Sequence, residues 1–110
     1  MQTNDLYPGK IIFQYKRNAK NQLQGVVLAI GPEIMGWALC SKHDIFNKET
    51  GVRIALRRAL KSATLSRADK IKYYTTCPNS LQELFVKGLD RSVFYFQKNY
   101  VHPLVHIERS

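Results

Sequence analysis

Apolar side chains recur at steps of three and four between residues 47 and 63, and this spacing constrains the fold more than any other feature of the chain. A helix with one apolar stripe must bury that stripe against another element. Asn47 offers an N-cap side chain, and Glu49 places a carboxylate in the first turn, where it suits the helix dipole. The stripe consists of Val52, Ala55, Leu56, Ala59, Leu60 and Ala63. The sequence therefore predicts an amphipathic helix that packs on a sheet.

The residues before this helix contain three runs with the composition of β-strands. They are residues 10–16 (KIIFQYK), 23–30 (LQGVVLAI) and 34–41 (IMGWALCS). These runs are rich in strand-forming residues, and polar or Gly-Pro segments separate them. Because short connections join strands that lie side by side, we expect an antiparallel meander. Residues 70–76 (KIKYYTT) and 104–108 (LVHIE) are two further strand candidates.

A second helix is expected after Pro78. Ser80 and Glu83 have the spacing of a capping box, and apolar residues follow at helical intervals. Residues 93–96 (VFYF) either continue this helix or form a strand. Residues 1–9 are expected to form a loose leader. The chain is thus predicted to be a single α+β domain over residues 1–110, with an antiparallel sheet of four to six strands packed with two α-helices.

The charge of the chain points to anionic partners. Among its 110 residues are 17 Lys and Arg against 8 Asp and Glu, which gives a net charge of +9. Such a surplus attracts nucleic acid, phosphorylated small molecules or acidic protein surfaces, and charge alone does not separate these partners. No apolar run approaches the roughly 18 residues that span a bilayer, and the N-terminus lacks the pattern of a signal peptide. We expect a cytoplasmic protein with no membrane segment and with free thiols at Cys40 and Cys77.

Arginines on the first predicted helix are the leading candidates for ligand binding. Arg53, Arg57 and Lys61 are spaced four apart along one flank, with Arg58 further round the polar side. A strand-to-helix corner does not require three arginines, whereas phosphate recognition does use guanidinium groups. Basic and aromatic residues also interleave at residues 70–74 and 91–100, a mixture that suits base stacking with phosphate neutralisation. The predicted ligand-binding residues are Arg53, Arg57, Arg58, Arg91, Arg109 and Tyr74.

Catalytic and metal chemistry find weak support in the sequence. Cys40 and His43 are close in sequence, but Cys40 ends an apolar strand, where a thiol is more often inert. Ser41, His43 and Asp44 cluster on one turn, and residues this near in sequence rarely form a working triad. A proline separates His102 from His106, and no C-x-x-C pair is present, so a zinc site is not expected. No phosphate-binding loop motif occurs either. We therefore expect no catalytic residue, no metal and no cofactor.

The most distinctive segment is residues 36–59, GWALCSKHDIFNKETGVRIALRRA. Asp44, Phe46 and Gly51 in it suit a structural corner at least as well as a ligand site. In such a corner the carboxylate bonds turn amides, the ring fills the corner and the glycine permits close contact between the helix and the sheet. The pattern C-x-x-x-D-x-F-x-x-x-x-G-x-x-I-A-x-x-R-A also resembles small phage-encoded proteins, among them the Thoeris anti-defence sponges. That resemblance implies a short chain that mixes a sheet with two helices and has no enzymatic activity. It further implies sequestration of cyclic nucleotide signals, including cyclic ADP-ribose isomers, in pockets lined with arginine and aromatic residues.

The sequence thus predicts a non-catalytic phage anti-defence protein that sequesters a cyclic nucleotide immune signal in the cytoplasm of an infected bacterial cell. Two alternatives stay open: a small basic protein that binds nucleic acid, and an inhibitor that docks on a host defence enzyme. A homo-oligomer is expected from chain size and from the resemblance. Ile54 adds to this expectation, because it lies on the basic side of the helix with no predicted partner within the chain.

Overall fold

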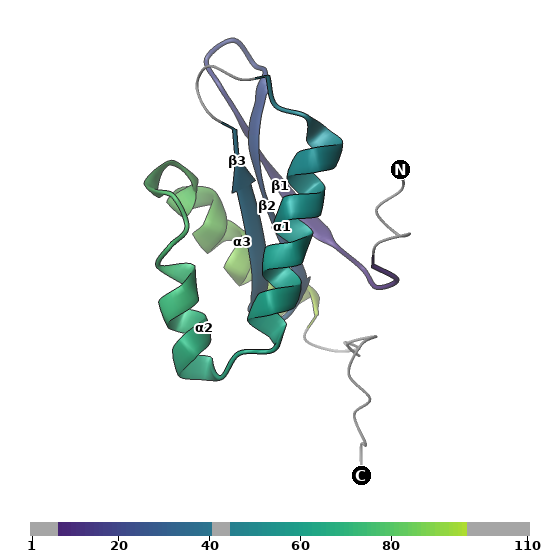
Figure 1. The fold of residues 1–110 in the computed structure, drawn as a ribbon, viewed down its shortest axis with the longest axis vertical. Helices are drawn as coiled ribbons and strands as arrows, with labels where there is room; N and C mark the ends of the chain where they lie inside the picture. The colour runs from purple at the N-terminus through teal and green to yellow at the C-terminus, as the bar shows by residue number, and fades with distance from the viewer. Residues whose placement is uncertain (1–6, 41–44, 97–110) are drawn as a thin grey trace.

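The computed structural model describes residues 7–40 and 45–96, and within them a three-stranded antiparallel sheet carries three α-helices (Figure 1). The strands are β1 (Ile12–Arg17), β2 (Leu23–Gly31) and β3 (Ile34–Leu39), paired in the order β1-β2-β3. The helices are α1 (Lys48–Ala63), α2 (Arg67–Tyr74) and α3 (Gln82–Tyr95), and the 3₁₀ turn η2 (Asn79–Leu81) precedes α3. The α+β class and the meander are confirmed. The prediction of four to six strands and two helices is wrong for this described part of the chain.

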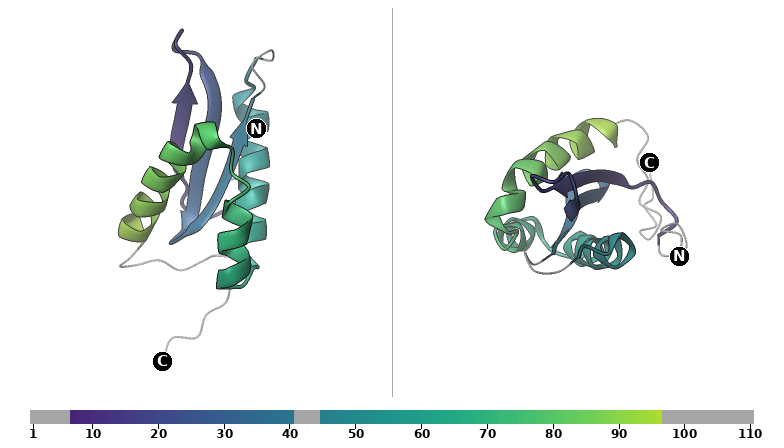
Figure 2. Two further views of the ribbon diagram at one scale, coloured as in Figure 1. Left: turned by 90° about the vertical axis from the view of Figure 1, so that its left-hand side faces the viewer. Right: turned by 90° about the horizontal axis from the view of Figure 1, so that it is seen from above.

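Both faces of the sheet are buried, which explains why β2 is apolar without a break after Gln24 rather than alternating. Val26, Leu28 and Ile30 belong to the core beneath α1, whereas Val27 and Ala29 belong to the core beneath α3. Successive residues of a strand point to opposite faces, so each face of β2 supplies one core. Seen from above, α3 lies over one face of the sheet and α1 lies against the other (Figure 2).

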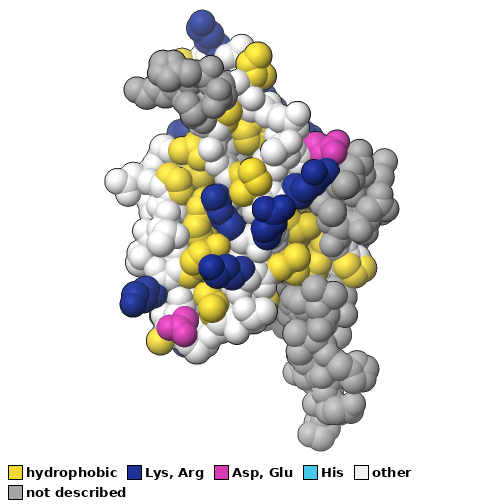
Figure 3. All heavy atoms as spheres, viewed as in Figure 1, with side chains coloured by type: hydrophobic (Ala, Val, Ile, Leu, Met, Phe, Trp, Pro, Cys, Tyr) yellow, Lys and Arg dark blue, Asp and Glu magenta, His cyan; other side chains and the backbone are white. Residues whose placement is uncertain are grey.

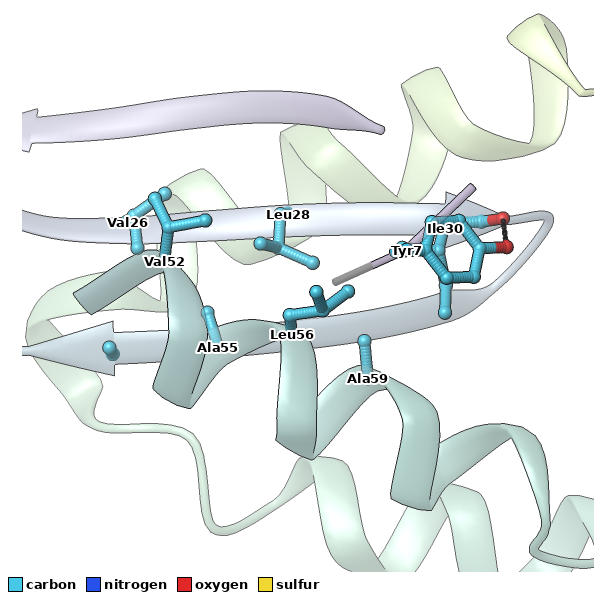
Figure 4. Packing of buried hydrophobic residues seen from close by; sticks show 9 residues of the cluster. Tyr7, Val26, Leu28, Ile30, Val52, Ala55, Leu56 and Ala59 are labelled. Carbon is cyan, nitrogen blue, oxygen red and sulfur yellow. Dashed lines mark hydrogen bonds between the residues drawn. The ribbon is translucent and has the colours of Figure 1, made fainter. Parts of the chain in front are cut away.

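The helix α1 begins and packs as its sequence predicts. Asn47 Oδ1 accepts a hydrogen bond from Thr50 N at 2.9 Å, which confirms the N-cap. The apolar stripe of α1 faces β2, with small side chains beside large ones (Figure 4). The closest approach is at Gly36 of β3, where an added Cβ would lie only 2.7 Å from Ala59 N. A glycine at this position therefore lets the helix backbone lie directly on the strand.

The corner that leads into α1 is packed by Phe46. Its ring lies against Gly51, where an added Cβ would overlap the ring atoms, and it contacts the core beneath α1. The predicted structural role of Phe46 is confirmed. Gly51 makes room for this ring rather than for the sheet, which corrects the expected reason for that glycine. Asp44 lies outside the described residues.

Residues 70–76 were expected to form a strand, and this prediction is wrong because most of them belong to α2. Ser66 caps this helix, with its Oγ accepting a hydrogen bond from Asp69 N at 3.2 Å. Ser66 and Asp69 have the S-x-x-D spacing that marks a helix start, so the signal was present in the sequence. No residue of α2 is fully buried, and its tyrosines Tyr73 and Tyr74 pack against the core beneath α3.

The second predicted helix exists but begins differently. Ser80 lies within η2, and α3 follows with Leu81 as its N-cap residue and no capping hydrogen bond from a side chain. The predicted capping box of Ser80 and Glu83 is therefore wrong. Leu81 is fully buried beneath the sheet, so the apolar contact rather than a polar cap fixes the helix start. Residues 93–96 continue α3, which ends at Tyr95.

The predicted loose leader is wrong at Tyr7. This side chain is fully buried in the core beneath α1, and its hydroxyl donates to the carbonyl oxygen of Ile30 at 3.2 Å (Figure 4). Burial raises the pKa of the Tyr7 phenol above its ordinary value. The aromatic ring lies beside Ile30 in this core (Figure 4). The strand candidate at residues 104–108 lies outside the described residues.

Candidate functional site

The outer surface of α1 is strongly basic, as expected from the spacing of its arginines. Figure 3 shows Lys and Arg side chains gathered over this helix. Arg53 forms an ion pair with Glu49, 3.0 Å between Nη2 and Oε1. Arg57 is exposed one turn further along, with no ion pair to any residue within 7–40 and 45–96. Arg53 and Arg57 therefore lie one turn apart on α1, but Arg53 already has a carboxylate partner.

Arg58 is fixed in place by the sheet. Its Nη1 donates to the carbonyl oxygen of Trp37 at 2.7 Å, and its guanidinium lies 5.6 Å from the centre of the Trp37 ring. A hydrogen bond to a carbonyl and a cation–π contact hold the planar group in one orientation. A guanidinium has five donors and this bond uses one of them, so the contact with Trp37 also fixes the orientation of the remaining donors.

Lys61 completes this surface, although it is not among the predicted ligand-binding residues. It follows Arg57 by four residues and Arg58 by three, so the three side chains are neighbours on the helix surface. Its Nζ lies 5.2 Å from the centre of the Tyr73 ring, which in turn packs 5.3 Å from Trp37. We call Arg57, Arg58 and Lys61 the basic cluster. None of the three forms an ion pair within the described part of the chain.

Tyr74 has a different environment from the one the sequence predicts. Its hydroxyl donates to the carbonyl oxygen of Glu33 at 2.6 Å, accepts from Met35 N at 2.9 Å and lies 3.1 Å from Ser62 Oγ. Burial raises the pKa of Tyr74 above its ordinary value, and the Ser62 hydrogen bond opposes that rise. Its ring packs edge-on against Phe85 at 4.9 Å. Tyr74, which was predicted to bind ligand, therefore has partners within the fold for both its hydroxyl and its ring.

These contacts close the outer edge of the sheet. β3 is an edge strand, and unpaired backbone groups on such an edge invite pairing with another chain. Here the Met35 amide bonds to Tyr74, the Met35 carbonyl to Ser62 at 3.3 Å and the Trp37 carbonyl to Arg58. Side chains from α1 and α2 therefore take the place of a fourth strand, and the basic cluster lies beside this closed edge.

Arg91 lies apart from the other predicted residues. It is exposed on α3, which covers the opposite face of the sheet from α1 (Figure 2). Together with Asp90, Phe94 and Tyr95 it lines an open hollow of about 390 Å³. The sixth predicted residue, Arg109, lies outside the described residues.

The cysteines are free thiols, as predicted. Cys77 is buried in the core beneath α3, and desolvation raises the pKa of its thiol to about 11, with Arg58 opposing the rise. At neutral pH this thiol is protonated, whereas the thiolate is the nucleophilic form. Among residues 7–40 and 45–96, no three His, Cys, Asp or Glu side chains converge as a metal site requires. The three histidines lie outside those ranges.

The argument for a homo-oligomer from Ile54 does not hold. Its side chain is partly buried and packs against the core beneath α1, so it has a partner within the chain. None of the described helices combines the length and apolar character that crossing a membrane requires. A scan against protein-family models and searches of curated proteins and of solved structures found no match.

Proposed function

We propose that this protein binds a phosphate-bearing nucleotide without altering it chemically, and that the basic cluster holds the phosphates. The observation that carries this proposal is the arrangement of Arg57, Arg58 and Lys61. These are three adjacent cations with no described carboxylate partner, and one of them is held rigidly by the Trp37 carbonyl. An arginine that is already oriented loses little conformational entropy when it binds a phosphate.

Aromatic rings beside the cluster favour a nucleotide over a bare phosphate. Trp37 is only 3% exposed and cannot stack on a base, whereas Tyr73 is half-buried and contacts both Trp37 and Lys61. A base that stacks on Tyr73 would displace the Lys61 ammonium from the ring, and the phosphates of the nucleotide would lie near Lys61 and Arg58. The ligand we put forward is a cyclic nucleotide signal, as the resemblance of residues 36–59 to the sponge family implies. A phage origin and sequestration in the cytoplasm of an infected cell belong to the same proposal.

The direct test is mass spectrometry of nucleotides released by heat from protein purified out of cells that produce cyclic nucleotide signals. We expect one intact nucleotide in a stoichiometric amount. Release from the Arg57→Ala variant should fall by about 10- to 100-fold, the scale of losing a charge-assisted hydrogen bond. Arg57 is the better choice for this test because Arg58 also bonds Trp37 within the fold. Lys20→Ala, which removes an exposed charge from the β1–β2 turn, is the matched control.

Two results would contradict the proposal. Equal release from Arg57→Ala, Lys20→Ala and the unmodified protein would show that the basic cluster does not hold the ligand. A hydrolysed or linearised product in excess of the protein would show that the ligand is turned over. Arg91→Ala separates the two faces, because its loss should leave release unchanged if the phosphates bind at α1.

Nucleic acid is a second candidate, favoured by the continuation of positive charge from α1 onto the next helix. α2 carries Arg67, Lys70 and Lys72 against a single carboxylate, Asp69. A nucleic-acid backbone releases condensed counterions when such a stripe neutralises it, so affinity falls steeply with salt. Fluorescence anisotropy with labelled oligonucleotides across a salt series distinguishes the candidates. A steep slope with submicromolar affinity at physiological salt favours nucleic acid. If neither ligand binds, an inhibitor that docks on a defence enzyme is the candidate that remains.

A further inference from the structure

The outer surface of α3 exposes apolar side chains that the fold does not use. Val86 is 54% exposed, Val93 41% and Phe94 83%. Residues at positions i, i+7 and i+8 lie on the same side of a helix, so these three form one stripe. Tyr95, 54% exposed, borders the hollow on the neighbouring flank. Single exposed apolar residues are common on soluble proteins, but a row along one helix marks an interaction surface.

The charges on α3 are balanced, unlike those on the other helices. α3 has a net charge of zero, from Lys87 and Arg91 against Glu83 and Asp90. α1 has a net charge of +4, from Lys48, Arg53, Arg57, Arg58 and Lys61 against Glu49. α2 has a net charge of +2, from Arg67, Lys70 and Lys72 against Asp69. Two copies of a molecule with a charge of +9 repel one another, so they associate most readily through a surface that carries no net charge.

We propose that the α3 surface is a homodimer interface, in which the α3 helices of two copies pack antiparallel. A two-fold interface uses the same patch on both copies and must be self-complementary. The α3 surface meets this requirement when the two-fold axis passes between the levels of Asp90 and Arg91, because the carboxylate of Asp90 would then lie opposite Arg91 of the second copy. Neither Asp90 nor Arg91 forms an ion pair among the described residues, so both are available. The apolar stripe and the hollow beside it would be covered together.

The size of the surface sets the expected affinity. A helix of 14 residues is about 21 Å long. One such helix buries less than the roughly 800 Å² per partner that a stable interface provides. We therefore expect a dimer that dissociates in the micromolar range of about 1–100 μM. The basic cluster stays accessible in this dimer, because α1 lies on the opposite face of the sheet (Figure 2). The inference does not depend on the proposed function.

Sedimentation velocity over concentrations from about 1 μM to 1 mM tests the proposal, since this range spans the expected dissociation constant. The unmodified protein should shift from monomer to dimer. Phe94→Glu should weaken the dimer at least about tenfold, as expected for a central apolar contact. Ile71→Glu is the matched control, because Ile71 on α2 is 58% exposed and the substitution changes the charge equally. This control should dimerise like the unmodified protein.

A charge exchange gives a readout that misfolding would not produce. Asp90→Arg and Arg91→Asp should each weaken self-association, and an equal mixture of the two variants should restore the dimer. Asp90→Arg makes the α3 surface basic and Arg91→Asp makes it acidic, so the two variants should attract each other where each alone repels its own copy. A monomer at all concentrations would overturn the proposal. A dimer that Phe94→Glu and Ile71→Glu weaken equally, or a mixture with no rescue, would also overturn it and place any association on another surface.

Discussion

The contact between α1 and β3 leads to a quantitative prediction at Gly36. A methyl group added here meets the backbone of α1: it would overlap the Ala55 carbonyl oxygen and lie 2.7 Å from Ala59 N. Backbone atoms of a helix cannot rotate away as a side chain can, so α1 must move off the sheet. Overpacking of a core costs about 1–3 kcal/mol, and rigid backbone neighbours place Gly36→Ala at the upper end. Lower entropy of the unfolded chain offsets about 0.4–1 kcal/mol, which leaves a net loss of about 2 kcal/mol.

Gly88→Ala is the matched control, with the opposite expected sign. Its Cβ would meet the flexible end of Met35 at 3.0 Å, with the next contact at 3.5 Å. An alanine in the middle of a helix is favoured over glycine by about 1 kcal/mol, so Gly88→Ala should be neutral or slightly stabilising. Urea unfolding followed by far-ultraviolet circular dichroism gives both free energies. If Gly36→Ala is as stable as Gly88→Ala, α1 does not lie on β3 as described.

Three further predictions concern the edge of β3, the buried thiol and the anchored arginine. Tyr74→Phe should lower the free energy of unfolding by about 1–3 kcal/mol, because it leaves the Met35 amide without its acceptor, whereas Tyr73→Phe should change it little in the same urea assay. Because the pKa of Cys77 is about 11 in the folded protein and 9.0 ordinarily, the unfolded state loses this proton first as pH rises. Stability should therefore fall between pH 9 and pH 11 by about 1.4 kcal/mol per pH unit more than in Cys77→Ala, and equal slopes in chemical denaturation would contradict the assignment. Arg58→Lys should lower the amount of nucleotide recovered from the heated protein by more than its loss of fold stability accounts for, since lysine keeps the charge but lacks the planar donors that Trp37 orients. An unchanged amount would show that charge alone suffices.

Local signals in the sequence account for the elements that were predicted correctly. The helix from Lys48 to Ala63 carries its own cap and its own apolar stripe, and the meander follows from short polar connections. Alternation over residues 70–76 predicts a strand, but the S-x-x-D pattern that begins at Ser66 starts a helix, α2, which includes most of these residues. At Ser80 the local pattern misleads instead. Ser80 and Glu83 have the spacing of a capping box, yet burial of Leu81 determines where α3 begins.

In the candidate site, the sequence predicts which side chains α1 carries but not the partners that each of them contacts. Spacing alone places Arg53 and Arg57 along one flank of the helix and Arg58 further round its polar side. Arg58 is distinguished by its contact with Trp37 on the sheet, and Arg53 by its ion pair with Glu49 one turn earlier in the helix. Spacing along the sequence therefore does not show which arginine is available to a ligand. The backbone of Glu33 likewise depends on a residue that is distant in the sequence. Its φ of 61° is unusual for a residue other than glycine, and its amide is held by Ser92 Oγ at 3.0 Å from α3, 59 residues away.

The weak attachment of α2 has a consequence for how the molecule opens. Helices with few buried contacts detach at lower free energy than the core, as separate cooperative units. α2 has no fully buried residue, yet its Tyr74 hydroxyl bonds the amide of Met35 at the edge of β3. Each transient detachment of α2 would therefore uncover strand backbone while the rest of the fold stays intact. Amide hydrogen exchange should show α2 and Met35 exchanging together, ahead of β2. Aggregation of this protein should then depend on the rate of that local opening more than on its global stability.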